Sequence, residues 1–207
     1  MIWCNRLVPV AIILCVSSPA FGQSWMSYVS LEDRFSVNLP GNPAVRDIDY
    51  PSEYGAVFPG RIYTYEDGPN CYVITVIDYT DAERIHSERS NKTEADSLPI
   101  YWQIDVHASI AFAAWSFRQR DAEVTYDAWH YIDLVEGHQL QLTNADQSRT
   151  FAGIYLHESR LYILEASVPP RAPPPGLFQQ SLSFLDEKGN RVRYDSIYSN
   201  RPPLDGR

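Results

Sequence analysis

Hydrophobic and polar residues alternate in short segments along the first half of the chain, which is the pattern of half-buried β-strands. This alternation predicts strands over residues 24–29, 34–39, 44–49, 54–66 and 71–78, separated by turns. The second segment ends at Pro40-Gly41. Proline has no amide hydrogen to give to a sheet and glycine tolerates positive φ, so the pair ends the strand in a tight turn.

Both alternating sets of side chains are apolar in the segment 71–78. Cys71, Val73 and Ile77 would lie on one face of the strand, and Tyr72, Ile74 and Val76 on the other. A strand that is apolar on both faces belongs inside a sheet that is covered on both sides. We therefore expect this strand to be central.

The hydrophobic period changes to that of a helix between residues 100 and 118. Apolar side chains recur there at steps of three and four, so they would share one face of a helix of about five turns. These residues are Ile104, Ala108, Ala111, Phe112 and Trp115, and we expect them to pack on the sheet. The preceding segment, 81–97, is polar and predicts a short helix or a loop.

Strand patterns return in the second half, over residues 123–132, 139–143, 149–157 and 160–168. The segment 139–143 alternates cleanly, which predicts one wet face and a place near a sheet edge. Residues 157–160 predict a compact hairpin turn. The segment 169–175 holds five prolines and must be extended. A short helix is expected over 176–185, followed by a charged tail, 186–207, with a loose strand and a disordered end.

The first 22 residues have the order of a secretory signal peptide. Arg6 precedes an apolar run over 7–16, and the small residues Ala20 and Gly22 flank a cleavage site. The run is shorter than the roughly 20 residues that span a bilayer. We expect cleavage after Gly22 and a mature chain of about 185 residues in the periplasm; an uncleaved anchor is the alternative.

Cleavage would change the cysteine count and the charge. Cys4 and Cys15 would leave with the signal peptide, and Cys71 alone cannot form an intramolecular disulfide. The net charge of −9 would become about −10 with the loss of Arg6. An acidic surface repels phosphate backbones, so nucleic acid is not an expected partner. The mature chain has no further apolar stretch of membrane-spanning length, so no integral segment is expected.

Three sequence phrases carry a family resemblance: FSVNLPGNP at 35–43, RTFAGIYLHESRLYILEASVP at 149–169 and FQQSLSFL at 178–185. In this order the chain resembles the PsbP/Mog1-like group of exported bacterial proteins, which includes the DcrB-like periplasmic proteins. The resemblance covers residues 25–185 and fits a single domain over 23–185. It implies an α/β/α sandwich, with one mainly antiparallel sheet covered by helices on both faces, and it brings no catalytic set.

The sequence assigns no catalytic, cofactor-binding or metal residue. The mature histidines are His86, His107, His130, His138 and His157, and none stands at the spacing of a metal motif. Glu136-Gly137-His138 and His157-Glu158 are expected in turns; if the turns met, a weak zinc or calcium site would be conceivable. Cys71 predicts a buried, inert thiol. Ser181 is not in a nucleophile elbow.

Aromatic residues are the feature that packing alone explains least. They line both halves of the predicted sheet, at Tyr54, Tyr63, Tyr65, Tyr72 and Tyr79 and at Tyr126, Trp129, Tyr131, Tyr155 and Tyr162. Such side chains suit a binding face, and they also suit β-strands in general. The leading hypothesis is an exported, non-enzymatic binding or assembly-accessory protein with a protein or small-molecule ligand.

Two other functions remain open from the sequence. One is a metal-assisted hydrolase that uses His138 and His157 with nearby carboxylates, which requires these side chains to converge. The other is a cell-envelope structural protein that docks through its basic, proline-containing tail. That tail contains Arg191, Arg193, Arg201, Pro202 and Pro203.

Overall fold

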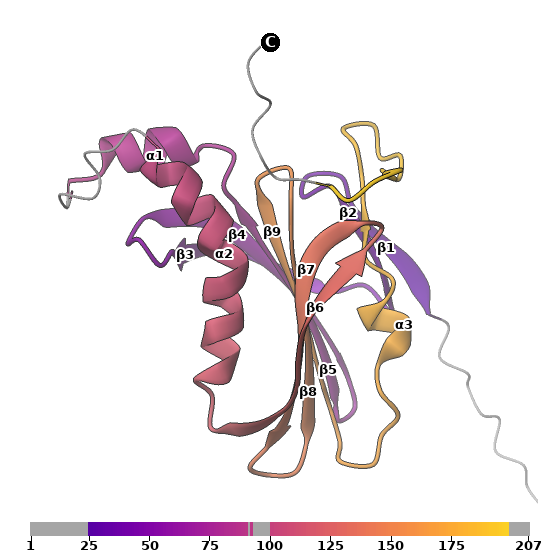
Figure 1. Ribbon diagram of the computed structural model, residues 1–207. Helices are drawn as coiled ribbons and strands as arrows, with labels where there is room; N and C mark the ends of the chain where they lie inside the picture. Colours follow the sequence, from indigo (N-terminus) through magenta and orange to yellow (C-terminus); the bar gives the residue numbers. More distant parts are fainter. Residues whose placement is uncertain (1–24, 91, 93–99, 199–207) are drawn as a thin grey trace, which may run out of the picture.

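The computed structural model describes residues 25–90, 92 and 100–198 (Figure 1). The predicted signal peptide and the expected disordered end of the tail lie outside the described residues. The strands are β1 (Met26–Ser30), β2 (Phe35–Leu39), β3 (Ala44–Pro51), β4 (Val57–Asp67), β5 (Asn70–Asp78), β6 (Ala122–Ile132), β7 (Val135–Asn144), β8 (Arg149–His157), β9 (Arg160–Val168) and β10 (Ser183–Phe184). The helices are α1 (Ala82–Glu88), α2 (Tyr101–Arg118) and α3 (Gly176–Gln179).

Seven strands form one antiparallel sheet in the order β3-β4-β5-β9-β8-β7-β6. The strand predicted to be central is β5, and it lies between β4 and β9 as expected. A second, three-stranded sheet has the order β1-β2-β10. The expected hairpins are present, including the one whose turn residues Glu158 and Ser159 both have positive φ.

The two faces of the large sheet have different covers. Helices α1 and α2 cover one face, where Phe58, Ile77 and Phe117 belong to the core. The small sheet and α3 cover the other face, where Phe35 and Phe178 are fully buried. With ten strands in two sheets and three helices, the described structure is mostly β.

The predicted α/β/α sandwich with helices on both faces is wrong, because one cover is a sheet. The helix expected over 176–185 ends at Gln179, and Phe184 instead pairs with Phe35 across β10 and β2. The apolar residues around Phe178 and Phe184 fit a helix or a strand equally well by spacing. Pairing with β2 decides the outcome, and β2 is distant in sequence.

The helix predicted near residues 100–118 is confirmed as α2, but it buries a different face. Val106, Ile110 and Phe117 lie against the sheet. From the predicted core stripe, Ile104 is 37% exposed and Trp115 is 52% exposed. Helix α2 is apolar on two opposite sides, so its period alone could not select the buried one.

Tyr155 fixes the packing between β7 and β8. Its ring lies over Gly137, and a Cβ built at Gly137 would approach the ring to 2.2 Å and the carbonyl oxygen of Ile154 to 2.3 Å. The hydroxyl of Tyr155 lies 3.0 Å from Nδ1 of His130 on β6. The expected turn at 136–138 is thus wrong, because Gly137 is inside β7. Glycine is required there for close approach of the tyrosine.

The described part of the tail folds back on the domain near the end of β8. The tail forms two isolated bridges, Leu185 with Arg191 and Val135 with Tyr198. The hydroxyl of Tyr194 lies 2.7 Å from Nε2 of His157, whose ring stacks on Phe184 at 4.4 Å between centroids. The tail therefore helps to bury the imidazole.

Gly137→Ala is expected to lower the free energy of unfolding by at least about 2 kcal/mol, because the new methyl group overlaps the backbone and ring of β8. Denaturant unfolding of both proteins measures the difference. Gly176→Ala is the matched control, since nothing lies within 4 Å of a Cβ there and its φ is ordinary. Equal midpoints for both variants would contradict the close approach.

Burial lowers the pKa of His157 to about 4, from an ordinary value of 6.5. Below pH 6.5 the unfolded chain binds a proton at His157 that the folded chain does not bind. The contribution of this histidine to the free energy of unfolding is therefore complete above pH 6.5. As the pH falls to about 4, the free energy of unfolding decreases by at most about 3 kcal/mol for this reason. Unfolding free energies from pH 7 to pH 4 should therefore fall more steeply for the wild type than for His157→Gln. Parallel curves would refute the burial of a neutral imidazole.

Candidate functional site

The structure divides the aromatic residues of the strands into core and surface groups. Tyr63, Tyr72, Tyr79, Tyr155 and Tyr162 are buried, so for them the packing explanation holds. Tyr54 and Tyr65 are half-buried. The exposed group is Tyr126, Trp129 and Tyr131, and all three lie on β6. The aromatic feature of the sequence thus reduces to one surface strand.

Strand β6 is an edge of the seven-stranded sheet. It pairs with β7 on one side, and no strand among the described residues pairs with its other side. The register shifts between Val124 and Tyr126, which marks a bulge. Beyond the bulge, Trp129 is 62% exposed. The strand therefore offers free backbone groups together with exposed aromatic rings.

The opposite edge, β3, differs in its side chains. It has Arg46, Asp47 and Asp49, and it ends at Pro51. Charged residues and proline protect sheet edges against further pairing. The segment of β6 after the bulge has one formal charge, at Asp127, and no lysine or proline. Of the two edges, β6 is the less protected.

A cluster of charged groups joins the end of α2 to β6 and β7. The guanidinium of Arg118 donates hydrogen bonds of 2.7 and 2.9 Å to Asp127, and Nε2 of His138 contacts the same carboxylate. The hydrogen bonds from Arg118, and to a smaller extent the contact with His138, lower the pKa of Asp127 to about 2. The carboxylate is thus ionised and neutralised within the cluster.

The same cluster supports Trp129. The indole lies edge-on to the ring of His138, with 5.3 Å between the ring centroids. His138 is itself 8% exposed and is fixed by Asp127 and Arg118. The exposed indole therefore packs against a side chain that two polar partners hold in place.

His138 and His157 do not converge. His138 alternates with Leu140 and Leu142, which belong to the core beneath α2. His157 alternates with Tyr155, which belongs to the core beneath the small sheet. The two imidazoles lie on opposite faces of the large sheet, so they cannot bind one metal ion. In the described ranges, no group of three or more His, Cys, Asp or Glu residues could hold a metal.

A buried polar cluster lies where α1, α2 and the β3–β4 connection meet. The hydroxyl of Ser52 donates to Oδ2 of Asp105 at 2.6 Å, and Nε2 of His86 lies 2.9 Å from the same oxygen. Burial raises the pKa of Asp105. In a serine hydrolase the imidazole stands between serine and carboxylate. Here the carboxylate is in the middle, so the cluster joins elements and does not activate Ser52.

The two other candidate nucleophiles are held in structural roles. The thiol of Cys71 is half-buried, and burial, with Glu66 and Glu165 nearby, raises its pKa. It therefore stays protonated near neutral pH. The hydroxyl of Ser181 donates to the carbonyl oxygen of Phe178 and accepts from the amide of Asn38. It fixes the turn before β10.

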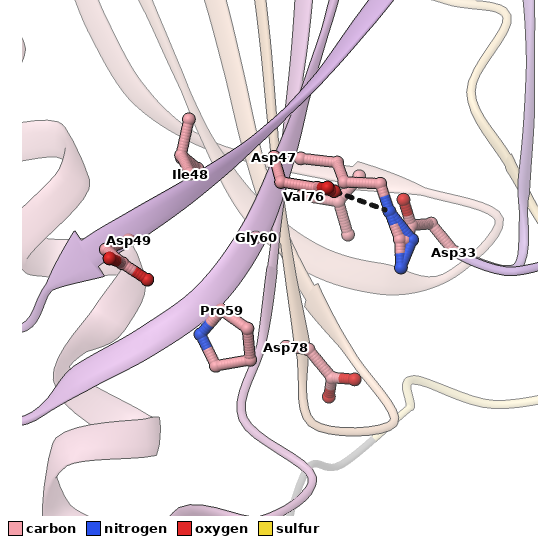
Figure 2. A pocket seen from close by; sticks show the side chains of 9 residues that line it. Asp33, Asp47, Ile48, Asp49, Pro59, Gly60, Val76 and Asp78 are labelled. Carbon is pink, nitrogen blue, oxygen red and sulfur yellow. Dashed lines mark ion pairs between the residues drawn. The ribbon is translucent and has the colours of Figure 1, made fainter.

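A pocket of about 350 Å³ lies on the other half of the sheet, and Figure 2 shows the side chains that line it. It is lined by Asp33, Asp47, Ile48, Asp49, Pro59, Gly60, Arg61, Val76 and Asp78. The guanidinium of Arg61 lies 3.4 Å from Asp33 and 3.8 Å from Asp47, and it also pairs with Glu32 at 2.6 Å. The arginine thus neutralises part of the acidic lining.

The same pocket joins the two sheets. Asp33 comes from the turn between β1 and β2, and its carboxylate accepts a hydrogen bond from Tyr63 on β4. The hydroxyl of Tyr162 donates to the carbonyl oxygen of Asp33 at 2.9 Å. Burial raises the pKa of Asp33, which the hydrogen bond from Tyr63 opposes. Asp33 therefore has a structural role, because it links the small sheet to β4 and β9 of the large sheet.

Sequence patterns missed the charged cluster that supports β6. Arg118 and Asp127 belong to different elements, and no short motif joins them.

Sequence patterns also placed Trp115 of α2 in the core, whereas it is on the surface. One signal of a second apolar face on this helix was available, because α2 contains only two Asp, Glu, Lys or Arg residues, Asp105 and Arg118.

No helix among the described residues combines the length and apolarity needed to cross a bilayer.

No protein-family model matches the chain, and no curated protein matches it. Among solved structures, the chain is similar to the solution structure of cyanobacterial PsbP (CyanoP) from Synechocystis sp. PCC 6803. The two share 12% sequence identity over 73% of this chain and 84% of that chain, with a TM-score of 0.37. The kinship with the PsbP/Mog1-like group that the sequence phrases predict, including the DcrB-like proteins, stays a prediction. At this level of similarity, no role is carried over to this chain.

Proposed function

We propose that the protein is an exported, non-enzymatic accessory protein that binds an extended segment of a partner protein along β6. The observation that carries this proposal is the unprotected sheet edge with Tyr126, Trp129 and Tyr131 exposed on it. The signal-peptide pattern in residues 1–22 supports action in the periplasm.

The free edge of β6 supplies the backbone part of the recognition. An extended peptide that adds to a sheet edge gains main-chain hydrogen bonds, and pockets or rings beside the edge select its side chains. Strand β6 has 11 residues. The bulge between Val124 and Tyr126 limits regular pairing to the part that follows it, Tyr126 to Ile132.

The aromatic rings supply the side-chain part. Successive residues of a strand point to opposite faces. Trp129 and Tyr131 share the face of α2, and Tyr126 lies on the face of Tyr155. Rings on both faces of the edge would flank an added strand. Trp and Tyr bury a large area at low entropic cost, especially when held as Trp129 is by His138.

The proposal predicts that Trp129→Ser with Tyr131→Ser removes partner binding. Each ring should contribute about 2 kcal/mol, so the affinity should fall by roughly a thousandfold when both are lost. The measurement is capture of a protein from periplasmic extract on the immobilised chain, followed by titration of that captured protein. Val45→Ser is the matched control, because Val45 is an exposed apolar residue on the opposite edge.

Hydrogen exchange then tests the mode of binding. Amides of β6 after the bulge should exchange more slowly in the captured complex, because they become hydrogen-bonded to the added strand. Equal capture by the wild type, the β6 double variant and the Val45 variant would refute the proposed site. Binding without slower exchange in β6 would refute strand addition.

A further inference from the structure

The outward face of α2 is mainly apolar, and no element among the described residues covers it. Figure 1 shows α2 crossing one face of the large sheet, with none of the labelled elements outside it. Ile104, Ala111 and Trp115 are exposed on this outward face, and Ala108 and Phe112 are half-buried beside them. The face lies opposite Val106, Ile110, Ala113 and Phe117, which pack on the sheet.

Polar groups on this outward face are few: His107 is exposed on it, and Glu53 lies beside its pocket. The two charged residues of α2 are both engaged elsewhere: Asp105 is buried with Ser52 and His86, and Arg118 is paired with Asp127. A surface helix of a globular protein normally has charged and polar residues opposite its core stripe. The cores of protein interfaces are instead depleted in charge and enriched in aromatic residues. The composition of this face is therefore that of an interface.

The order of side chains along the face selects the partner. Along its midline the residues run Ile104, Ala108, Ala111, Trp115, with the exposed His107 beside the alanines, which places a large side chain at each end and two small ones in the middle. When an identical helix is placed antiparallel about a two-fold axis, the two alanines face each other. Ile104 of each copy then faces Trp115 of the other. A symmetric interface needs such a self-complementary patch.

A pocket lies where the large side chain of the second copy would arrive. Phe112 and Trp115 stack with 5.9 Å between their centroids, and together with Ala111 and Glu53 they line a pocket of about 360 Å³. In the antiparallel arrangement, Ile104 of the second copy enters this pocket. The two alanines at the centre permit close approach of the helix axes, which lie 8–10 Å apart in packed helices.

We propose that the protein forms a homodimer through antiparallel packing of α2 against α2 of a second copy. The 18 residues of α2 extend over about 27 Å. One helix face of that length buries less than the roughly 800 Å² per partner of a standard interface. The dimer is accordingly weak, with dissociation in the micromolar range. The proposal is independent of peptide binding at β6.

Sedimentation equilibrium of the chain, expressed from its full sequence, measures self-association. The expected result is a monomer–dimer equilibrium at concentrations up to about 200 μM, in the micromolar range of affinity. Trp115→Asp should weaken it at least tenfold, since one charge enters each end of the interface. The control is Leu177→Asp, because Leu177 is an exposed apolar residue on α3, away from α2. Circular dichroism checks that both variants fold.

Cysteine cross-linking tests the geometry with Trp115 intact, in a Cys71→Ser background. A mixture of Ala108→Cys and Ala111→Cys chains should form a disulfide-linked dimer under mild oxidation. Ile104→Cys alone should not, because antiparallel packing separates its two copies by roughly 16 Å along the helices. A monomer at every concentration, a dimer unchanged by Trp115→Asp, or cross-linking through Ile104→Cys alone would each overturn the proposal. Loss of the dimer with partner binding at β6 unchanged separates this interface from the proposed peptide site.

Discussion

Burial of both faces of the central strands is the constraint on which the rest of the structure depends. Every residue of β8 after Arg149 is buried, and β5 and β9 contribute to both cores. A strand in this position needs an apolar cover on each side, because its backbone and side chains have no route to water. The chain meets this need with two covers of different kinds: a helical layer on one side, and a small sheet with α3 on the other.

Close packing at these covers limits which residues can be present. Tyr155 occupies space that any side chain at Gly137 would need, and its hydroxyl contacts His130 on β6. The Arg118, Asp127 and His138 cluster acts on the opposite face of the same strands. Strand β6 is therefore held from both faces while its outer edge stays free. A rigid strand with a free edge binds an extended segment with little loss of conformational entropy.

The helical cover has a surplus of apolar surface. Helix α2 needs one apolar face for the sheet, and it has a second, mainly apolar one that contains Trp115 and Ile104. Exposed contiguous apolar surface is costly in a monomer and is typical of association sites. The edge of β6 and the outward face of α2 are separate surfaces built from different elements. Substitutions can therefore be made in one surface while the other is left unchanged.

The sequence by itself determined strands β1 to β9, the long helix, the hairpin at Glu158-Ser159 and the interior place of β5 in the sheet. These features depend on local alternation and turn residues, which act over a few neighbouring positions. Only the tertiary structure decided that one cover is a sheet, which of the two apolar faces of α2 is buried, and which tyrosines reach the surface. It also separated His138 from His157 by a whole sheet. The reason is that such outcomes depend on pairing between segments far apart in the chain, and the period of hydrophobic residues is the same whichever partner a segment packs against.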